Sequence, residues 1–111
     1  MKKLLLISFL FPCIVFGQKT YVPDNGFEFY LENSGMGDGI YNNDSVLTAN
    51  ISGVTSLYIS SKSMSDLTGI EDFAALTYLG CRENQLTSLD VSNITALTVL
   101  SCSWNQLTSL D

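Results

Sequence analysis

Residues 76–90 read LTYLGCRENQLTSLD, and residues 97–111 read LTVLSCSWNQLTSLD. The two segments lie 21 residues apart, and their Leu, Cys, Asn and Gln residues fall at matching positions. A fixed period in this range is typical of solenoid proteins, in which each repeat forms one rung and buries its apolar face against neighbouring rungs. A solenoid offers a surface rather than a cleft, so the repeat favours binding over catalysis.

A weaker copy of the segment precedes these two. At an offset of 22 it carries Val54, Leu57, Ile59, Met64 and Leu67, with Lys62 where the later copies have Asn. Apolar residues between the copies are expected to fill the return side of each rung: Ile70, Phe73, Val91 and Ile94. The sequence therefore predicts one variant repeat from Val54, one full repeat, and one that stops at Asp111 before its rung closes.

The spacing inside a repeat predicts a short strand followed by an inward turn. Leu79 and Cys81 alternate along the chain, so both point to one face of a strand. Asn84 comes where the chain leaves that strand. Because an Asn amide both donates and accepts hydrogen bonds, it can satisfy backbone groups that the turn removes from water. We predict that Asn84 and Asn105 stack as a structural ladder along the turns.

Cys81 and Cys102 occupy the same position in successive rungs. Parallel strands stack about 4.8 Å apart, which falls within the range of about 4.4–6.8 Å between Cα atoms in disulfides. The two side chains point the same way rather than toward each other, which favours an inward ladder of small apolar residues. A disulfide is the alternative, because an exported protein can form one.

The N-terminus is typical of a secretory signal peptide. Met1-Lys2-Lys3 is basic, and the apolar run from Leu4 to Phe16 is too short to cross about 30 Å of hydrocarbon as a helix. We predict a signal peptide over residues 1–17, cleaved before Gln18, and no membrane insertion after cleavage. A retained anchor and a lipoprotein modified at Cys13 are the alternatives. The expected location is secreted or at the cell surface.

The non-repeating residues 18–53 are expected to cap the open end of the first rung. Asp24 is a candidate N-cap for a helix whose apolar face carries Phe27, Tyr30 and Leu31. Glycines at positions 35, 37 and 39 should end the helix. Four later residues are expected to join the core: Ile40, Val46, Leu47 and Ile51.

Acidic residues in this region allow two interpretations. Asp24, Glu28 and Glu32 recur every four residues, which fits a solvated helix face better than a cation site. The segment 38–44 is rich in oxygen ligands but lacks the order of an EF-hand loop. The tripeptide from Asp44 to Val46 is similar to an O-glycosylation motif of Bacteroidetes, which would modify Ser45.

Composition excludes several functions. The chain has no histidine, so it cannot use a histidine base or histidine-ligated zinc. Beyond Gln18, three basic residues (Lys19, Lys62 and Arg82) face eleven acidic ones, a net charge of −8. Nucleic acid is therefore a poor partner. No catalytic site, metal site or cofactor is predicted, and no oligomer.

The repeats resemble the leucine-rich repeat family, whose pattern is LxxLxLxxNxL. The match covers 76–86 and 97–107, with Cys in place of the third Leu. Residues 21–28 (YVPDNGFE), 67–73 (LTGIEDF) and 86–92 (LTSLDVS) are similar to secreted leucine-rich repeat proteins of Bacteroidetes. The resemblance implies a right-handed β-α superhelix with one short parallel strand per rung of 21–22 residues. Such proteins usually carry more repeats, and often a sorting domain, so we expect this chain to be an N-terminal fragment with repeats over 54–111.

The resemblance also implies that the concave face of the sheet binds the ligand. The outward positions of the strands present three aromatic residues and one cation, which are Tyr58, Tyr78, Trp104 and Arg82. Exposed Trp, Tyr and Arg dominate protein recognition, and aromatic faces also suit sugar rings. We therefore predict a protein or glycan ligand, although such side chains are also tolerated on surfaces without function.

Three functions compete at this stage. The first is non-enzymatic recognition or adhesion through the concave face. The second is a structural spacer whose repeats only set length. The third is a targeting arm for a catalytic domain further along a longer protein.

Overall fold

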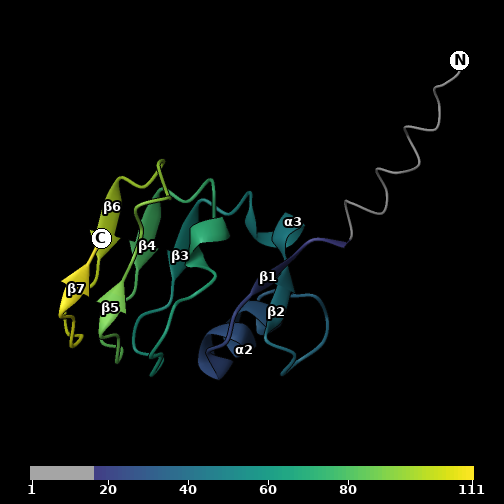
Figure 1. Cartoon of the computed structure of the whole chain (residues 1–111), viewed down its shortest axis with the longest axis horizontal. Helices are drawn as coiled ribbons and strands as arrows, with labels where there is room; N and C mark the ends of the chain where they lie inside the picture. Colours follow the sequence, from purple (N-terminus) through teal and green to yellow (C-terminus); the bar gives the residue numbers. More distant parts are fainter. Residues whose placement is uncertain (1–16) are drawn as a thin grey trace, which may run out of the picture.

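The computed structural model describes residues 17–111 and shows a row of stacked rungs with a separate capping unit at one end (Figure 1). Residues 1–16, which hold nearly all of the predicted signal peptide, lie outside the described residues. The elements are β1 (Lys19–Tyr21), α2 (Asn25–Asn33), β2 (Ser45–Leu47), α3 (Thr48–Ile51), β3 (Ser56–Tyr58), the 3-10 helix η1 (Ile70–Asp72), β4 (Tyr78–Gly80), β5 (Ser88–Leu89), β6 (Val99–Ser101) and β7 (Ser109–Leu110).

The repeats form a parallel sheet in the order β3-β4-β6. Leu57 pairs with Leu79, and Leu79 pairs with Leu100, so equivalent residues of successive repeats lie side by side. This register confirms the alignment predicted from the 21- and 22-residue offsets. The ladder continues past the strand ends, because the Ser61 amide donates to the Arg82 carbonyl at 2.9 Å and the Glu83 amide to the Ser103 carbonyl at 3.0 Å.

The return side of the rungs differs from the prediction of one strand per rung. A second parallel sheet joins β5 to β7. Each of the last two rungs therefore contains two strands, β4 with β5 and then β6 with β7 (Figure 1). The first rung returns through η1, and the described repeats contain no α-helix on this side. A rung of about 21 residues leaves too few residues for a helix. The last two residues of each Leu-Thr-Ser-Leu segment, Ser and Leu, instead form a two-residue strand.

The core is one continuous stack of apolar side chains between the two sides of the rungs. Leu76, Leu79 and Leu86 are fully buried within the full repeat, as the spacing predicts. The core continues into the capping unit, where the rings of Phe27 and Phe73 stack with centroids 6.2 Å apart. Burial of apolar area on both sides of this junction holds the helix against the first rung.

The capping unit combines a helix with a two-stranded sheet. Asp24 is the N-cap of α2 and its Oδ1 accepts from the Phe27 amide at 2.9 Å, which confirms the predicted helix start. Phe27 and Leu31 are buried, and β1 pairs antiparallel with β2. Ile40 contradicts the prediction that it joins the core, because it is 56% exposed.

The acidic side chains of α2 do not form a solvated face. Glu28 is 1% exposed and its carboxylate accepts from the backbone amides of Asn43 and Asp44 at 3.2 and 3.1 Å. Glu32 accepts from the amides of Asp38 and Gly39 at 3.0 and 2.9 Å. These carboxylates replace water as partners for loop amides, so the expectation of a solvated stripe is wrong.

Asp24 and Gly69 join the capping unit to the repeats. The second carboxylate oxygen of Asp24 accepts from the amides of Ser65 and Asp66 at 2.9 and 3.1 Å. Gly69 has φ 106°, and a Cβ built there would lie 2.8 Å from the Tyr21 carbonyl oxygen. A side chain at this position would meet both backbone strain and a clash, so close contact between cap and rung requires glycine.

Candidate functional site

The outward face of the β3-β4-β6 sheet carries the predicted ligand-binding residues, and we call it the outer face. Tyr58 and Tyr78 project from adjacent strands, and their ring centroids lie 5.0 Å apart at an interplanar angle of 37°. Tyr58 is 63% exposed, and Tyr78 is half-buried. The structure thus brings two predicted residues together as a tilted aromatic pair.

Gly80 explains why Tyr78 is half-buried on an outward face. A Cβ built at Gly80 would lie 3.0 Å from the Tyr78 hydroxyl oxygen and 3.1 Å from a carbon of its ring. The ring therefore lies across Gly80 along its own strand, and Gly80 is buried beneath it. Sequence analysis did not assign this role to Gly80, although a glycine two residues after an outward tyrosine is a signal that could have indicated it.

Arg82 follows Gly80 by two residues and lies on the same face, because the parallel ladder continues beyond β4. Its Nε donates to Ser103 Oγ at 2.9 Å, so the guanidinium turns toward the rung of β6. Its backbone amide donates to Ser60 Oγ at 3.1 Å. Within residues 17–111 the ion pair is Lys19 with Asp38, so no acidic group of this range neutralises Arg82.

Trp104 lies at the end of the strand segment, in the same column as Ser61 and Glu83. All three residues have left-handed backbones, with φ of 63°, 59° and 57° respectively. The Glu83 carboxylate accepts a hydrogen bond from Ser61 Oγ and so turns toward the rung of β3, opposite to Arg82. Trp104 is 72% exposed, and as the single Trp of the chain it can report on ligands.

Asn84 bridges its own turn to the preceding rung. Its Oδ1 accepts from the amides of Lys62 and Met64 at 3.1 and 3.0 Å, and its Nδ2 donates to the Ile59 carbonyl at 2.8 Å. Asn105 repeats most of this pattern one rung later, since its Oδ1 accepts from the Leu86 amide at 3.0 Å and its Nδ2 donates to the Cys81 carbonyl at 3.0 Å. Each amide therefore satisfies backbone groups of the rung before it.

Cys81 and Cys102 are free thiols in this structure. Cys81 is fully buried and Cys102 is partly exposed. Burial and, to a lesser extent, the neighbouring Cys102 raise the pKa of the Cys81 thiol to about 12. A thiol that stays protonated is a poor nucleophile and a poor metal ligand, so Cys81 acts as a small apolar residue.

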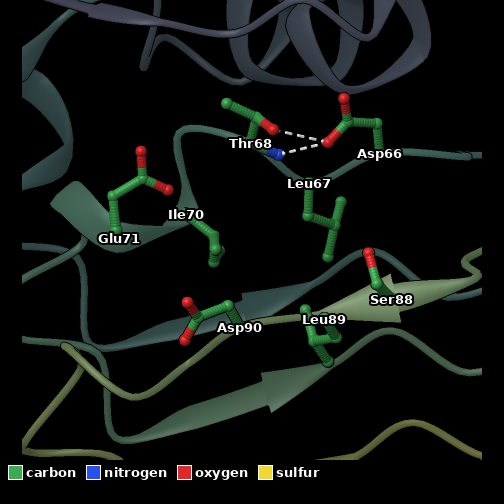
Figure 2. Close-up of a pocket in the computed structure, with 8 residues that line it drawn as sticks. All are labelled: Asp66, Leu67, Thr68, Ile70, Glu71, Ser88, Leu89 and Asp90. Carbon is green, nitrogen blue, oxygen red and sulfur yellow. Dashed lines mark hydrogen bonds between the residues drawn. The ribbon is translucent and has the colours of Figure 1, made fainter. Parts of the chain in front are cut away.

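The return side contains a hollow of about 120 Å³ lined by acidic residues (Figure 2). Asp66 and Glu71 lie at opposite ends of it, with Leu67 and Ile70 between them. Asp66 accepts from the amide and hydroxyl of Thr68, and Glu71 accepts from the Gly69 amide. Hydrogen bonds from Ser92 lower the pKa of Asp90. These carboxylates stabilise turns, and they do not converge as an acid and base pair would.

Three further observations bear on the site. Phe29 and Tyr41 form an exposed aromatic pair on the capping unit, with centroids 5.7 Å apart, which sequence analysis missed because these residues do not repeat. Across residues 17–111, no three side chains among Cys, Asp and Glu gather as a metal site would require. None of the helices in this range has the length and apolar character needed to cross a membrane.

The stacked parallel strands, repeated Leu positions and turn Asn residues define a leucine-rich repeat, solenoid-like fold. Two solved structures share it. The functional domain of InlJ from Listeria monocytogenes, described as including a cysteine ladder, is 35% identical over 85% of this chain, with a TM-score of 0.67. An internalin from the same species, InlF, is 23% identical over 81% of this chain, with a TM-score of 0.64.

These likenesses have a defined extent. This chain spans 21% of the InlJ chain and 30% of the InlF chain. The InlF likeness concerns the fold alone. No family model matches the chain, and no curated protein does.

Proposed function

We propose that this chain is an exported, non-enzymatic recognition or adhesion module that binds a protein or glycan partner through its outer face, which becomes the concave face of a right-handed superhelix. Residues 1–17 would direct export, 18–53 would cap the array, and 54–111 would supply the binding surface. The likeness to the functional domain of InlJ supports a recognition or adhesion scaffold. The absence of histidine from the chain and the turn-bound carboxylates of the hollow argue against catalysis by this segment.

One observation carries the proposal. The outer face exposes Tyr58 and Trp104, supports Tyr78 over Gly80, and holds Arg82 without an acidic partner from residues 17–111. Aromatic side chains and Arg supply most of the binding energy at recognition surfaces. A protein that acts only as a spacer does not need exposed aromatic side chains and an unpaired Arg on this face, since small polar side chains would keep the surface equally soluble.

Residues with a left-handed backbone allow the role of a side chain to be tested by substitution with glycine, because glycine adopts this conformation without strain. Trp104→Gly removes the aromatic side chain and relieves a strained backbone conformation, so it should not unfold the protein. Ser63→Gly is the matched control, because Ser63 also has a left-handed backbone, with φ 57°, and its side chain makes no hydrogen bond within residues 17–111. Both variants should melt at or above the wild-type temperature in circular dichroism.

Binding is then measured on an array of immobilised glycans and extracellular matrix proteins, probed with the labelled full chain. We expect wild type and Ser63→Gly to bind the same spots, and Trp104→Gly and Tyr58→Ala to lose at least about tenfold in signal. Unchanged binding by both aromatic variants would refute the outer face as the binding surface. Complete absence of binding by the wild type would favour the spacer alternative.

A further inference from the structure

We infer that the outer face binds a sugar that carries a carboxylate, with the pyranose ring on Tyr78 and the carboxylate on Arg82. This inference rests on the proposed function and narrows its partner to an acidic glycan. It comes from the orientation of Tyr78 in β4 and of Arg82 two residues beyond the end of β4, not from their presence alone.

The guanidinium of Arg82 is held in place on one side and open on the other. Its Nε is engaged by Ser103, which fixes the plane of the guanidinium and leaves the two Nη groups without a protein acceptor among residues 17–111. Two parallel N–H donors match the two oxygens of a carboxylate. An exposed, oriented and unpaired Arg in a chain rich in acids is suited to a ligand that brings its own carboxylate.

The chain is acidic, yet its carboxylates are directed away from Arg82. Glu83, the nearest in sequence, bonds to Ser61 in the opposite direction. Asp66 and Glu71 line the hollow between η1 and β5 on the return side, and Glu28 and Glu32 bond to cap loops. Among residues 17–111 no carboxylate forms a salt bridge with the Arg82 guanidinium, and charges more than about 8 Å away are screened at physiological salt.

The ring of Tyr78 forms a flat platform beside Arg82. Tyr78 lies across Gly80, so its ring points along the strand toward Arg82. Residues two apart in a strand are separated by about 6.6 Å. A pyranose ring, about 5 Å across, resting on Tyr78 would place an exocyclic carboxylate within reach of the Arg82 guanidinium. Tyr58 closes one side of this platform, with its ring centroid 5.0 Å from that of Tyr78.

The side chains around this platform favour a sugar over an acidic peptide. Four of the remaining outward residues near the platform are small hydroxyl side chains: Ser56, Ser60, Ser101 and Ser103. The fifth is Val99, which pairs with Tyr78 and is 48% exposed, so it extends the apolar part of the platform. Short hydroxyls beside an aromatic ring match the alternation of hydroxyls and C–H groups on a sugar. Three strands spaced about 4.8 Å apart give a platform about 10 Å wide, the size of one or two sugar rings. A stable protein interface needs about 800 Å² on each partner, which is more area than a platform of this width offers, so the platform fits a sugar better than a protein.

The test is an NMR titration of the ¹⁵N-labelled full chain with methyl β-D-glucuronide and methyl β-D-glucoside, two sugars that differ only at C6, which is a carboxylate in the first and a hydroxymethyl group in the second. We expect the glucuronide to shift amides of residues 78–82 and 101–104 and to bind about fivefold more tightly than the glucoside. Arg82→Gln should make the two sugars equal. Gly80→Ala should weaken both about equally, because its Cβ displaces the Tyr78 ring.

Ser109→Ala, a change in β7 away from the outer face, is the control, and it should bind both sugars within about twofold of wild type. Equal binding of the two sugars by wild type, or no shifts with either at 20 mM, overturns the inference while leaving the outer-face proposal in place. Stronger shifts of the same amides by hexaglutamate assign the face to an acidic peptide, which also overturns it. Shifts confined to β5 and β7 overturn both the inference and the proposed function.

Discussion

Replacing Asn84 by Ala removes an amide that lies between two rungs. The side chain is 7% exposed, so water has little access to the groups it serves. Its loss leaves the Met64 amide and the Ile59 carbonyl without their side-chain partner, and both of these hydrogen bonds are buried. The cost therefore comes from stranded backbone groups rather than from lost apolar contact.

The magnitude follows from these two groups. A buried donor or acceptor left without a partner costs about 1–3 kcal/mol, so the pair should destabilise the protein by about 3 kcal/mol. Asn105 makes most of the equivalent contacts but is only partly buried, with its bond to the Ser103 carbonyl at the surface. Water can replace much of what it supplies, so Asn105→Ala should cost about 1 kcal/mol.

Urea titration followed by far-UV circular dichroism measures both variants. We expect the midpoint of Asn84→Ala to fall well below that of Asn105→Ala, with unchanged m-values, because the surface exposed on unfolding stays the same. If the two variants lost equal stability, burial of the turn amides would not set the cost. If Asn84→Ala matched wild type, the ladder would carry no stability and the reasoning would fail.

Three further predictions concern other parts of the chain. Burial of Asp38 opposes its ionisation, but hydrogen bonds from Asn43, the Ile40 amide and Lys19 outweigh it and lower the pKa of this carboxyl from 3.8 to about 2. The resulting stability, about 1–2 kcal/mol, is present above pH 4 and lost between pH 4 and 2, and Asp38→Asn should flatten that part of a plot of melting temperature against pH. At pH 8, iodoacetamide should alkylate the two thiols at different rates in the folded protein, Cys102 first and Cys81 only after unfolding, as peptide mass spectrometry would show; equal rates would contradict the burial of Cys81. Gly69→Ala should cost about 2 kcal/mol in a thermal melt, and a neutral result would mean that cap and rung can separate without loss.

Sequence repetition accounts for what could be predicted about the fold. Equivalent residues recur at offsets of 21 and 22, so each repeat indicates how its neighbour pairs, and the register of β3, β4 and β6 follows. The start of the helix at Asp24 could also be predicted, because N-cap positions favour particular residue types such as Asp, whatever the rest of the fold. The pairing of β1 with β2 was not, since it joins segments that are distant in the chain and occur only once.

The candidate site shows the same division. Alternation along a strand is enough to predict that Tyr58, Tyr78 and Arg82 share the outward face. The contact of Tyr78 with Gly80 and the bond from Arg82 to Ser103 depend on side-chain rotamers, which no spacing pattern encodes. The roles of the α2 carboxylates were not predictable for a related reason, because their partners are backbone amides and leave no trace in residue type.

The backward reach of the turn asparagines has a consequence for how such proteins change length. Asn84 serves groups of the preceding rung, and Asn105 serves the rung of Asn84. A duplicated rung inserted into the row would therefore carry an Asn whose side chain bonds to the backbone of the rung before it. The Asn of the rung after it would in turn bond to the backbone of the inserted rung. Gene duplication can lengthen the row without a single compensating substitution in the turns, and the outer face grows by one strand each time.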